Sequence, residues 1–226
     1  MRTGPWIASS ASPPRNDGSG RAHTALDSRP RQAHLCVIMA APGYSICAAD
    51  GLGRSLRLWR ALRRVKQAHA AELLQVSQAM VSRWEAGTLV PDADEQARLR
   101  RLMSARLDSA GDHALARLVT QSLGSSHLVC DLTHRLLAAS RGRSQDWNFR
   151  TPELLGVSLW RFATPEIQAA EAALTDEGWF EAEPPAVEIA TSANDSPIVP
   201  IRQGRMRWTR LQLSDGAFVR LAETIA

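Results

Sequence analysis

The stretch that most constrains the fold is Gln67–Gly87, with the sequence QAHAAELLQVSQAMVSRWEAG. Its apolar spacing predicts two short helices, at about Gln67–Leu74 and Gln78–Glu85, joined by a tight turn. In the first helix the small residues Ala70 and Ala71 lie on one stripe, which lets a second helix approach closely. The stretch therefore predicts two helices that cross at a steep angle.

The second of these helices has one apolar and one polar side. At about 100° per residue, Met80, Val81 and Trp84 share a side, which predicts that they pack against the domain. Ser77 is placed to cap the first turn, and Gly87 follows the C-terminus. The opposite side is small or polar and rich in hydrogen-bonding groups, as a helix that contacts base edges requires. It consists of Gln78, Ala79, Ser82 and Arg83.

Apolar residues at helical spacing predict three more helices, at about 55–65, 94–107 and 112–122. Residues 54–107 are therefore expected to form an all-α helix-turn-helix bundle. Residues 108–126 are expected to be a helical linker, which could instead pair with a second subunit.

Residues 56–107 resemble the phage-repressor (Cro/CI, or XRE) helix-turn-helix family. The sequence departs from the family pattern at Gln75, where many members have Gly, and at Lys66, where Ser or Thr is the usual cap. The resemblance implies a transcriptional regulator that binds a double-stranded DNA operator as a homodimer. The residues that carry it are Trp59-Arg60, Val65, Gln67, Ala71–Leu74, Val76–Gln78, Val81–Gly87 and Pro91.

The same resemblance implies roles for individual residues. Arg60 would pair with Glu85 and tie the first helix to the end of the second helix of the motif. Contacts to bases are implied for Gln78, Ala79, Ser82 and Arg83, although Arg83 could equally hold a phosphate. Contacts to DNA phosphates are expected from Gln67, Ser77, Lys66 and Thr88.

The charge distribution agrees with this assignment. Residues 54–106 contain 11 Lys and Arg against 5 Asp and Glu, whereas residues 107–226 contain 11 against 15. Positive charge on the segment with the motif is what phosphate neutralisation requires.

In the C-terminal part, residues 127–226, strand patterns appear beside the helical ones. Its order of strand pair, helices and antiparallel strands predicts an α+β domain. The strands are expected at 128–131, 135–140, 187–191, 198–202, 207–213 and 217–221, and the helices at 153–162 and 165–174.

This order is similar to that of a PAS fold, on the residues Leu128–Ser140, Leu155–Trp160 and the terminal hairpin. The resemblance implies a domain that senses a small-molecule ligand or assembles the dimer. No residues match the flavin-cysteine or haem-histidine patterns of some PAS proteins, so no cofactor is expected.

Two residue groups in this part are candidates for a site. Trp147, Trp160, Trp179 and Trp208 could line a small-molecule cavity, but a place in the core is favoured. His127, Cys130 and His134 have the spacing H-x2-C-x3-H, but strand alternation puts residues 127 and 130 on opposite faces. No metal site is therefore predicted.

The N-terminal residues 1–53 are expected to be a disordered extension, because 1–34 are rich in Pro, Ser, Gly and Arg. One hypothesis places the true start at Met39. The apolar run Leu35–Ala41 is too short to span a membrane. Three widely spaced cysteines suit a reducing compartment, so a cytoplasmic, nucleoid-associated protein is expected.

No phosphate-binding glycine loop, nucleophile elbow or metalloprotease helix is present in the sequence, so an enzyme is not expected. A DNA-binding regulator is the leading hypothesis. The alternatives are an antitoxin that represses its own operon, and an interaction or coactivator module that does not bind DNA.

Overall fold

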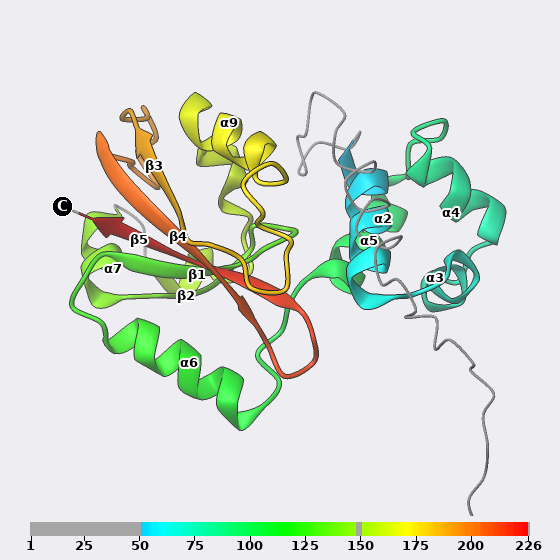
Figure 1. Ribbon diagram of the computed structural model, residues 1–226, viewed down its shortest axis with the longest axis horizontal. Coiled ribbons are helices and arrows are strands. Elements are labelled where there is room, and N and C mark those ends of the chain that lie inside the picture. The colour runs from blue at the N-terminus through cyan, green and yellow to red at the C-terminus, as the bar shows by residue number, and fades with distance from the viewer. Residues whose placement is uncertain (1–50, 148–150, 226) are drawn as a thin grey trace, which may run out of the picture.

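The computed structural model describes residues 51–147 and 151–225. Residues 1–50 of the disordered extension expected over 1–53, and the hypothetical start at Met39, lie outside the described residues. The described chain forms a helical bundle followed by a sheet domain, and the two lie side by side in Figure 1. Within these ranges, no helix has both the length and the apolar character needed to cross a bilayer.

The first four described helices pack around one apolar core. They are α2 (Leu52–Arg63), α3 (Gln67–Leu74), α4 (Gln78–Glu85) and α5 (Ala93–Met103). All four contribute buried side chains, which include Leu56, Trp59, Ala70, Ala71, Leu74, Val81, Trp84 and Leu99.

Helix α2 begins earlier than the sequence suggests. Leu52 and Gly53 are helical and buried, although the predicted extension ends at residue 53 and the helix was expected from about Ser55. A Cβ atom at Gly53 would lie 1.8 Å from the carbonyl oxygen of Trp84. The glycine therefore permits close packing of α2 on α4, rather than ending a helix.

Helices α5 and α6 (Ala110–Gln121) begin with reciprocal capping hydrogen bonds. The Glu95 amide donates to the Asp92 carboxylate at 2.8 Å, and the Asp92 amide donates to the Glu95 carboxylate at 2.8 Å. The sequence places these starts too late because it misses the caps upstream. Helix α5 also ends at Met103, not near Leu107.

The C-terminal part is an antiparallel five-stranded sheet with the order β2-β1-β5-β4-β3. This confirms the α+β class predicted for it. The strands are β1 (Ser126–Cys130), β2 (Leu136–Ala139), β3 (Val187–Thr191), β4 (Gly204–Gln212) and β5 (Phe218–Ile225). Between β2 and β3 lie α7 (Arg141–Asp146), α8 (Thr151–Leu154), the 3-10 helix η2 (Leu159–Phe162) and α9 (Pro165–Ala173).

Two elements of the sheet domain were predicted wrongly. The helix expected over 153–162 is broken, because α8 ends at Leu154 and Gly156 has a φ of 75°. The strand expected at 198–202 is an irregular segment. Its apolar residues satisfied the strand pattern, but Val199 packs in the core without pairing.

Side chains cover both faces of the sheet. On one face, Val119 of α6 belongs to the same core as Leu128 and Cys130, and α6 lies against β1 and β2 (Figure 1). On the other face, Val129 and Trp147 belong to a second core. The segment 108–126, expected to be a linker, thus contains a helix that packs on the sheet domain.

The bundle and the sheet domain share one apolar core, to which Leu99 and Met103 of α5 and Leu128 and Val219 of the sheet belong. Arg63 at the end of α2 pairs with Asp215 of the β4–β5 turn, Nη2 to Oδ2, at 2.9 Å. The Ala105 amide donates to the Cys130 sulfur at 3.2 Å. The ion pair therefore connects α2 to the β4–β5 turn, and the amide connects the segment after α5 to β1.

A buried ionic network holds the sheet domain together. The Asp131 carboxylate accepts from Arg210 Nε at 3.0 Å, from Arg220 Nη2 at 2.8 Å and from Trp179 Nε1 at 3.1 Å. Arg220 Nη1 also donates to Glu171 at 2.6 Å. Buried charges are tolerated only when paired in this way, so the network fixes α9 and the loop after β1 against β4 and β5.

We predict that Glu171→Gln destabilises the protein at pH 7 and reduces its acid sensitivity. Burial raises the pKa of the Glu171 carboxyl, but Arg220 and His134 lower it further, to about 2 from an ordinary 4.5. Because the pKa is lower in the folded state, the carboxylate's stabilisation is complete above pH 4.5 and is lost as the pH falls towards 2. Loss of one carboxylate from Arg220 should cost about 3 kcal/mol.

Urea unfolding followed by tryptophan fluorescence, at neutral pH and through the acid range, measures both effects. The exposed Glu177→Gln is the control and should behave like the parent. Equal stability of the Glu171→Gln variant and the parent at neutral pH would contradict the prediction.

Candidate functional site

Helix α4 separates its side chains into a buried and an exposed set. Val81 and Trp84 are buried, and Met80 is partly buried. We call the exposed set the α4 surface, and it contains the four residues expected to face bases. They are Gln78, Ala79, Ser82 and Arg83.

The turn before α4 has the geometry that the motif requires. Gln75 ends α3 in the left-handed conformation, with a φ of 57°. A non-glycine residue tolerates this conformation at a cost of about 1–2 kcal/mol. The Ser77 hydroxyl then accepts a hydrogen bond from the Met80 amide at 3.2 Å, so this side chain serves as the N-cap of α4.

The end of α4 is held by the buried carboxylate of Glu85. Arg60 of α2 donates to it through Nε at 2.5 Å and Nη2 at 2.6 Å. Gln67 of α3 donates its amide Nε2 to the same carboxylate at 2.9 Å. We call this group the Glu85 clamp. It contains the ion pair expected between Arg60 and Glu85, and it links α2, α3 and α4.

The residues expected to contact phosphates differ in burial and in the hydrogen bonds of their side chains. Gln67 is partly buried and its amide is bonded within the clamp. Lys66 is exposed at the start of α3 and makes no side-chain cap. Thr88 is exposed and donates its hydroxyl to the Arg83 carbonyl at 3.2 Å. Ser77, Lys66 and Thr88 are thus all exposed.

A groove of about 480 Å³ lies between α2 and the end of α4. Arg57, Arg60 and Arg64 line one wall, and Ser82 of the α4 surface contributes to the other. The sequence analysis did not assign Arg57 and Arg64 to DNA contacts. Arg57 lies three residues before Arg60 on the same face of α2, so its spacing could have indicated it. Arg64 follows the helix in the left-handed conformation, with a φ of 56°, and helical spacing does not place it.

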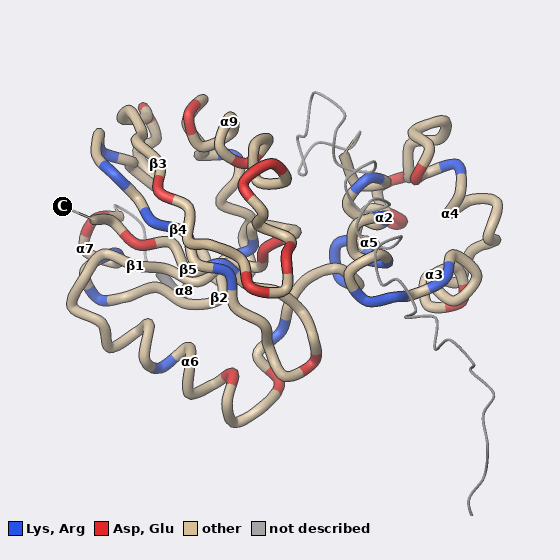
Figure 2. Tube along the Cα trace, in the orientation of Figure 1, with Lys and Arg blue, Asp and Glu red and all other residues tan. Residues whose placement is uncertain are grey.

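The charge distribution differs between the two parts of the chain. Figure 2 shows Lys and Arg spread over the bundle, including the α2–α3 connection, while Asp and Glu gather around α9 in the sheet domain. The basic groove and the α4 surface therefore belong to the basic part of the chain.

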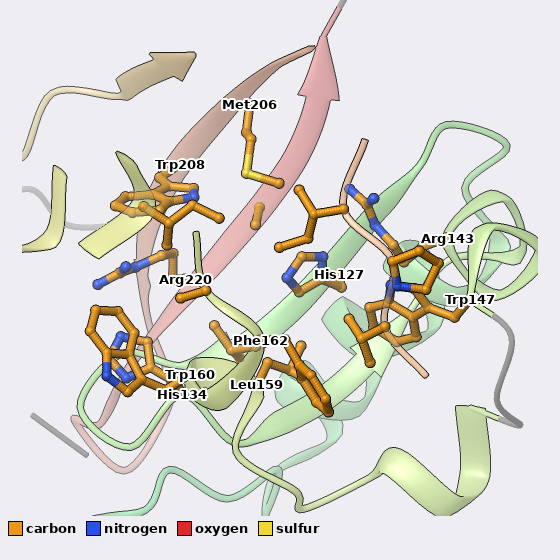
Figure 3. A pocket seen from close by; sticks show the side chains of 17 residues that line it. His127, His134, Arg143, Trp147, Leu159, Trp160, Phe162, Met206, Trp208 and Arg220 are labelled. Carbon is orange, nitrogen blue, oxygen red and sulfur yellow. The ribbon is translucent and has the colours of Figure 1, made fainter. Parts of the chain in front are cut away.

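A second candidate site is a cavity of about 80 Å³ between the sheet and its helices. His127 of β1 lies between two ends of this cavity in Figure 3. Arg143 and Trp147 lie at one end, and Arg220, Trp208 and Trp160 at the other. Apolar contacts come mainly from Val129, Leu159, Phe162, Ile167, Val199, Ile201, Met206 and Ala222.

Three of the four tryptophans belong to the core, as favoured from the sequence: Trp147, Trp179 and Trp208 are buried members of core clusters. Trp147, Trp160 and Trp208 also line the cavity. Trp179 is fully buried and bonded to Asp131. Sequence could not show which of them border the cavity, because a tryptophan beside a cavity and one inside the core are both surrounded by apolar residues.

The H-x2-C-x3-H group is spread over both faces of the sheet. His127 lines the cavity, whereas Cys130 faces the junction with the bundle. His134 follows β1 and contacts Trp160, with their ring centroids 4.7 Å apart. Among the described residues, no cluster of His, Cys, Asp or Glu is placed to hold a metal ion.

Positive charge surrounds His127. Burial, and then the charges of Arg143 and Arg220, hold the pKa of the His127 imidazole well below its ordinary 6.5. The imidazole is therefore neutral at neutral pH. Its Nδ1 and the Nε of Arg143 are buried, and the described residues offer neither atom a hydrogen-bond partner.

The chain matches no protein-family model and no curated protein sequence. Solved structures similar to it include the following two. The PAS domain of an HTR-like protein from Haloarcula marismortui is 15% identical with a TM-score of 0.37, and the match covers 57% of this chain and 98% of that one. An RNA-binding Light-Oxygen-Voltage receptor is 12% identical with a TM-score of 0.36, and the match covers 77% of this chain but only 58% of that one.

Similarities of this size do not assign a function. The fold of residues 126–225 rests instead on its own sheet, in which the first strand lies between the second and the fifth. With its helices inserted between the second and third strands, this sheet makes the C-terminal part a PAS-like α+β domain.

Proposed function

We propose that this protein is a sequence-specific, DNA-binding transcriptional regulator in which the α4 surface enters the major groove. The observation that supports this proposal most directly is that Gln78, Ser82 and Arg83 are exposed together on a helix whose opposite side is buried. Amide, hydroxyl and guanidinium groups are the side chains that bond base edges. Ala79 is small enough to approach a thymine methyl group.

The surroundings of α4 suit binding to the phosphate backbone. Residues 54–106 carry 11 Lys and Arg against 5 Asp and Glu. The groove beside α4 adds Arg57 and Arg64, next to Ser82. Phosphate contacts of this kind supply affinity and orientation, and the α4 surface supplies the specificity.

The resemblance of residues 56–107 to the phage-repressor family leads to the same proposal. The left-handed Gln75 takes the conformation that glycine supplies in many members. In that family the operator is bound by a homodimer, and one short helix contacts too few base pairs for useful specificity. We therefore extend the proposal to a homodimer, in which the PAS-like domain senses a small molecule or assembles the subunits.

The proposal is tested by selecting operators from a random double-stranded DNA library with the full chain. The expected result is an inverted repeat whose half-sites lie about 10 base pairs apart, or a multiple of that. An interaction or coactivator module would select no sequence. An antitoxin would select one but would also co-purify with a small toxic partner.

We predict that Arg83→Ala weakens binding to the selected operator and relaxes its sequence. A guanidinium that bonds a guanine contributes about 1–3 kcal/mol of discrimination, or about 5- to 150-fold in Kd. Fluorescence anisotropy on the operator and on a scrambled duplex measures both values. The exposed Arg101→Ala of α5 is the control, and an Arg83→Ala variant with the parent's operator preference would reject this role.

We predict a different outcome for Arg57→Ala and Arg64→Ala in the groove. Each should weaken binding to operator and scrambled DNA equally, because phosphates carry no sequence information. Each should also reduce the slope of log Kd against log salt concentration by about one. Arg161→Ala in the sheet domain is the control. A loss confined to the operator, or an unchanged slope, would contradict a phosphate role.

A further inference from the structure

The cavity of the sheet domain is lined by hydrogen-bond donors. Among the described residues that line it, the polar side chains are His127, His134, Arg143, Arg220 and the indoles of the tryptophans. None of those lining residues is Asp, Glu, Asn, Gln, Ser, Thr or Tyr. Arginine and tryptophan can only donate hydrogen bonds, and a neutral imidazole adds one acceptor. Donors therefore outnumber acceptors among these side chains, which favours a ligand that supplies acceptors.

Two carboxylates are engaged with Arg220, one of the lining residues. Asp131 and Glu171 are bonded to Arg220, and both of their side chains are 1% exposed. Neither lines the cavity. They neutralise Arg220 from outside the cavity, so neither places a negative charge in the lining that would repel an anion.

Arg143 is paired much less completely. Its Nη2 donates to the Ser125 carbonyl at 3.0 Å and to the Thr224 hydroxyl at 2.8 Å, which are both neutral. The carboxylate paired with it, Asp146, lies 3.8 Å away with its side chain 31% exposed. A buried cation with such weak compensation favours an anion nearby.

The rest of the lining is flat and apolar. Trp147, Trp160, Trp208 and Phe162 supply aromatic surface, and Leu159 and Met206 supply aliphatic surface (Figure 3). A water molecule needs about 10–15 Å³ of this kind of volume. A cavity of about 80 Å³ therefore has room for about five to eight water-sized groups, which suits a compact ligand with a single ring, because bonded atoms lie closer together than neighbouring waters.

We propose that this cavity binds a small organic carboxylate with a flat apolar body, with its acid group at the Arg143 and His127 end. The body then lies towards Trp160 and Trp208. A carboxylate has hydrogen-bond acceptors only, which complements the N–H donors of the arginine and tryptophan side chains that line the cavity. The inference rests on the sensing role proposed for the PAS-like domain and names the class of ligand.

Isothermal titration of the full chain, without DNA, tests the proposal with three isosteric probes. Benzoate is the anion, benzamide is neutral and benzamidinium is the planar cation. Benzoate should bind about tenfold or more tightly than benzamide, and benzamidinium should not bind. Quenching of tryptophan fluorescence should follow the benzoate titration, because three tryptophans line the cavity.

Variants of α7 locate the acid group. Arg143→Met should reduce benzoate affinity about tenfold or more and leave benzamide affinity unchanged. Arg143→Lys, which keeps the charge, should retain part of the benzoate affinity. It replaces Arg143→Met in the titration if that variant does not fold. The exposed Arg141→Met on the same helix is the matched control and should bind like the parent.

The proposal is overturned if benzamide or benzamidinium binds as tightly as benzoate, if Arg143→Met keeps the parent's preference, or if no probe binds at millimolar concentration. Because no DNA is present, these outcomes are independent of the operator selection. A protein that selects an operator but binds no carboxylate rejects this inference alone, and one that binds benzoate but selects no operator rejects the DNA-binding proposal alone.

Discussion

The Glu85 clamp is the interaction on which the proposed DNA-binding surface depends. A buried carboxylate is stable only with charged and hydrogen-bonding partners around it. Here the partners come from two other helices, Arg60 of α2 and Gln67 of α3. Because the carboxylate belongs to the last residue of α4, satisfying its charge also fixes the direction of the helix. The positions of the exposed side chains of α4 are fixed together with the helix.

The same principle organises the sheet domain. Asp131 and Glu171 are buried, and Arg210 and Arg220 converge on them from neighbouring strands. This balance leaves Arg143 as the weakly compensated cation beside the cavity. In both halves of the chain a structural ion pair thus lies directly beside the surface proposed to bind a ligand.

The sequence predicted well what depends on neighbours within a few residues. The two sides of α4 and the cap at Ser77 follow from local spacing, and the family resemblance marks position 75 as one where glycine is common. It failed where the deciding partner is distant in the chain. The role of Gly53 depends on the Trp84 carbonyl, and the network depends on Arg220, which lies 89 residues from Asp131. That Trp147, a core residue, also borders a cavity depends likewise on the segment Val199–Ile201.

The central claim is that the exposed side of α4 lies in the major groove. The most direct measurement is photo-crosslinking from a benzoylphenylalanine in place of Ala79, on the selected operator, with the same group at Glu177 of the sheet domain as control. The account predicts crosslinks from position 79 to bases of each half-site, at their major-groove edges, and none from position 177. Crosslinks from neither position, or from position 177 alone, would contradict it.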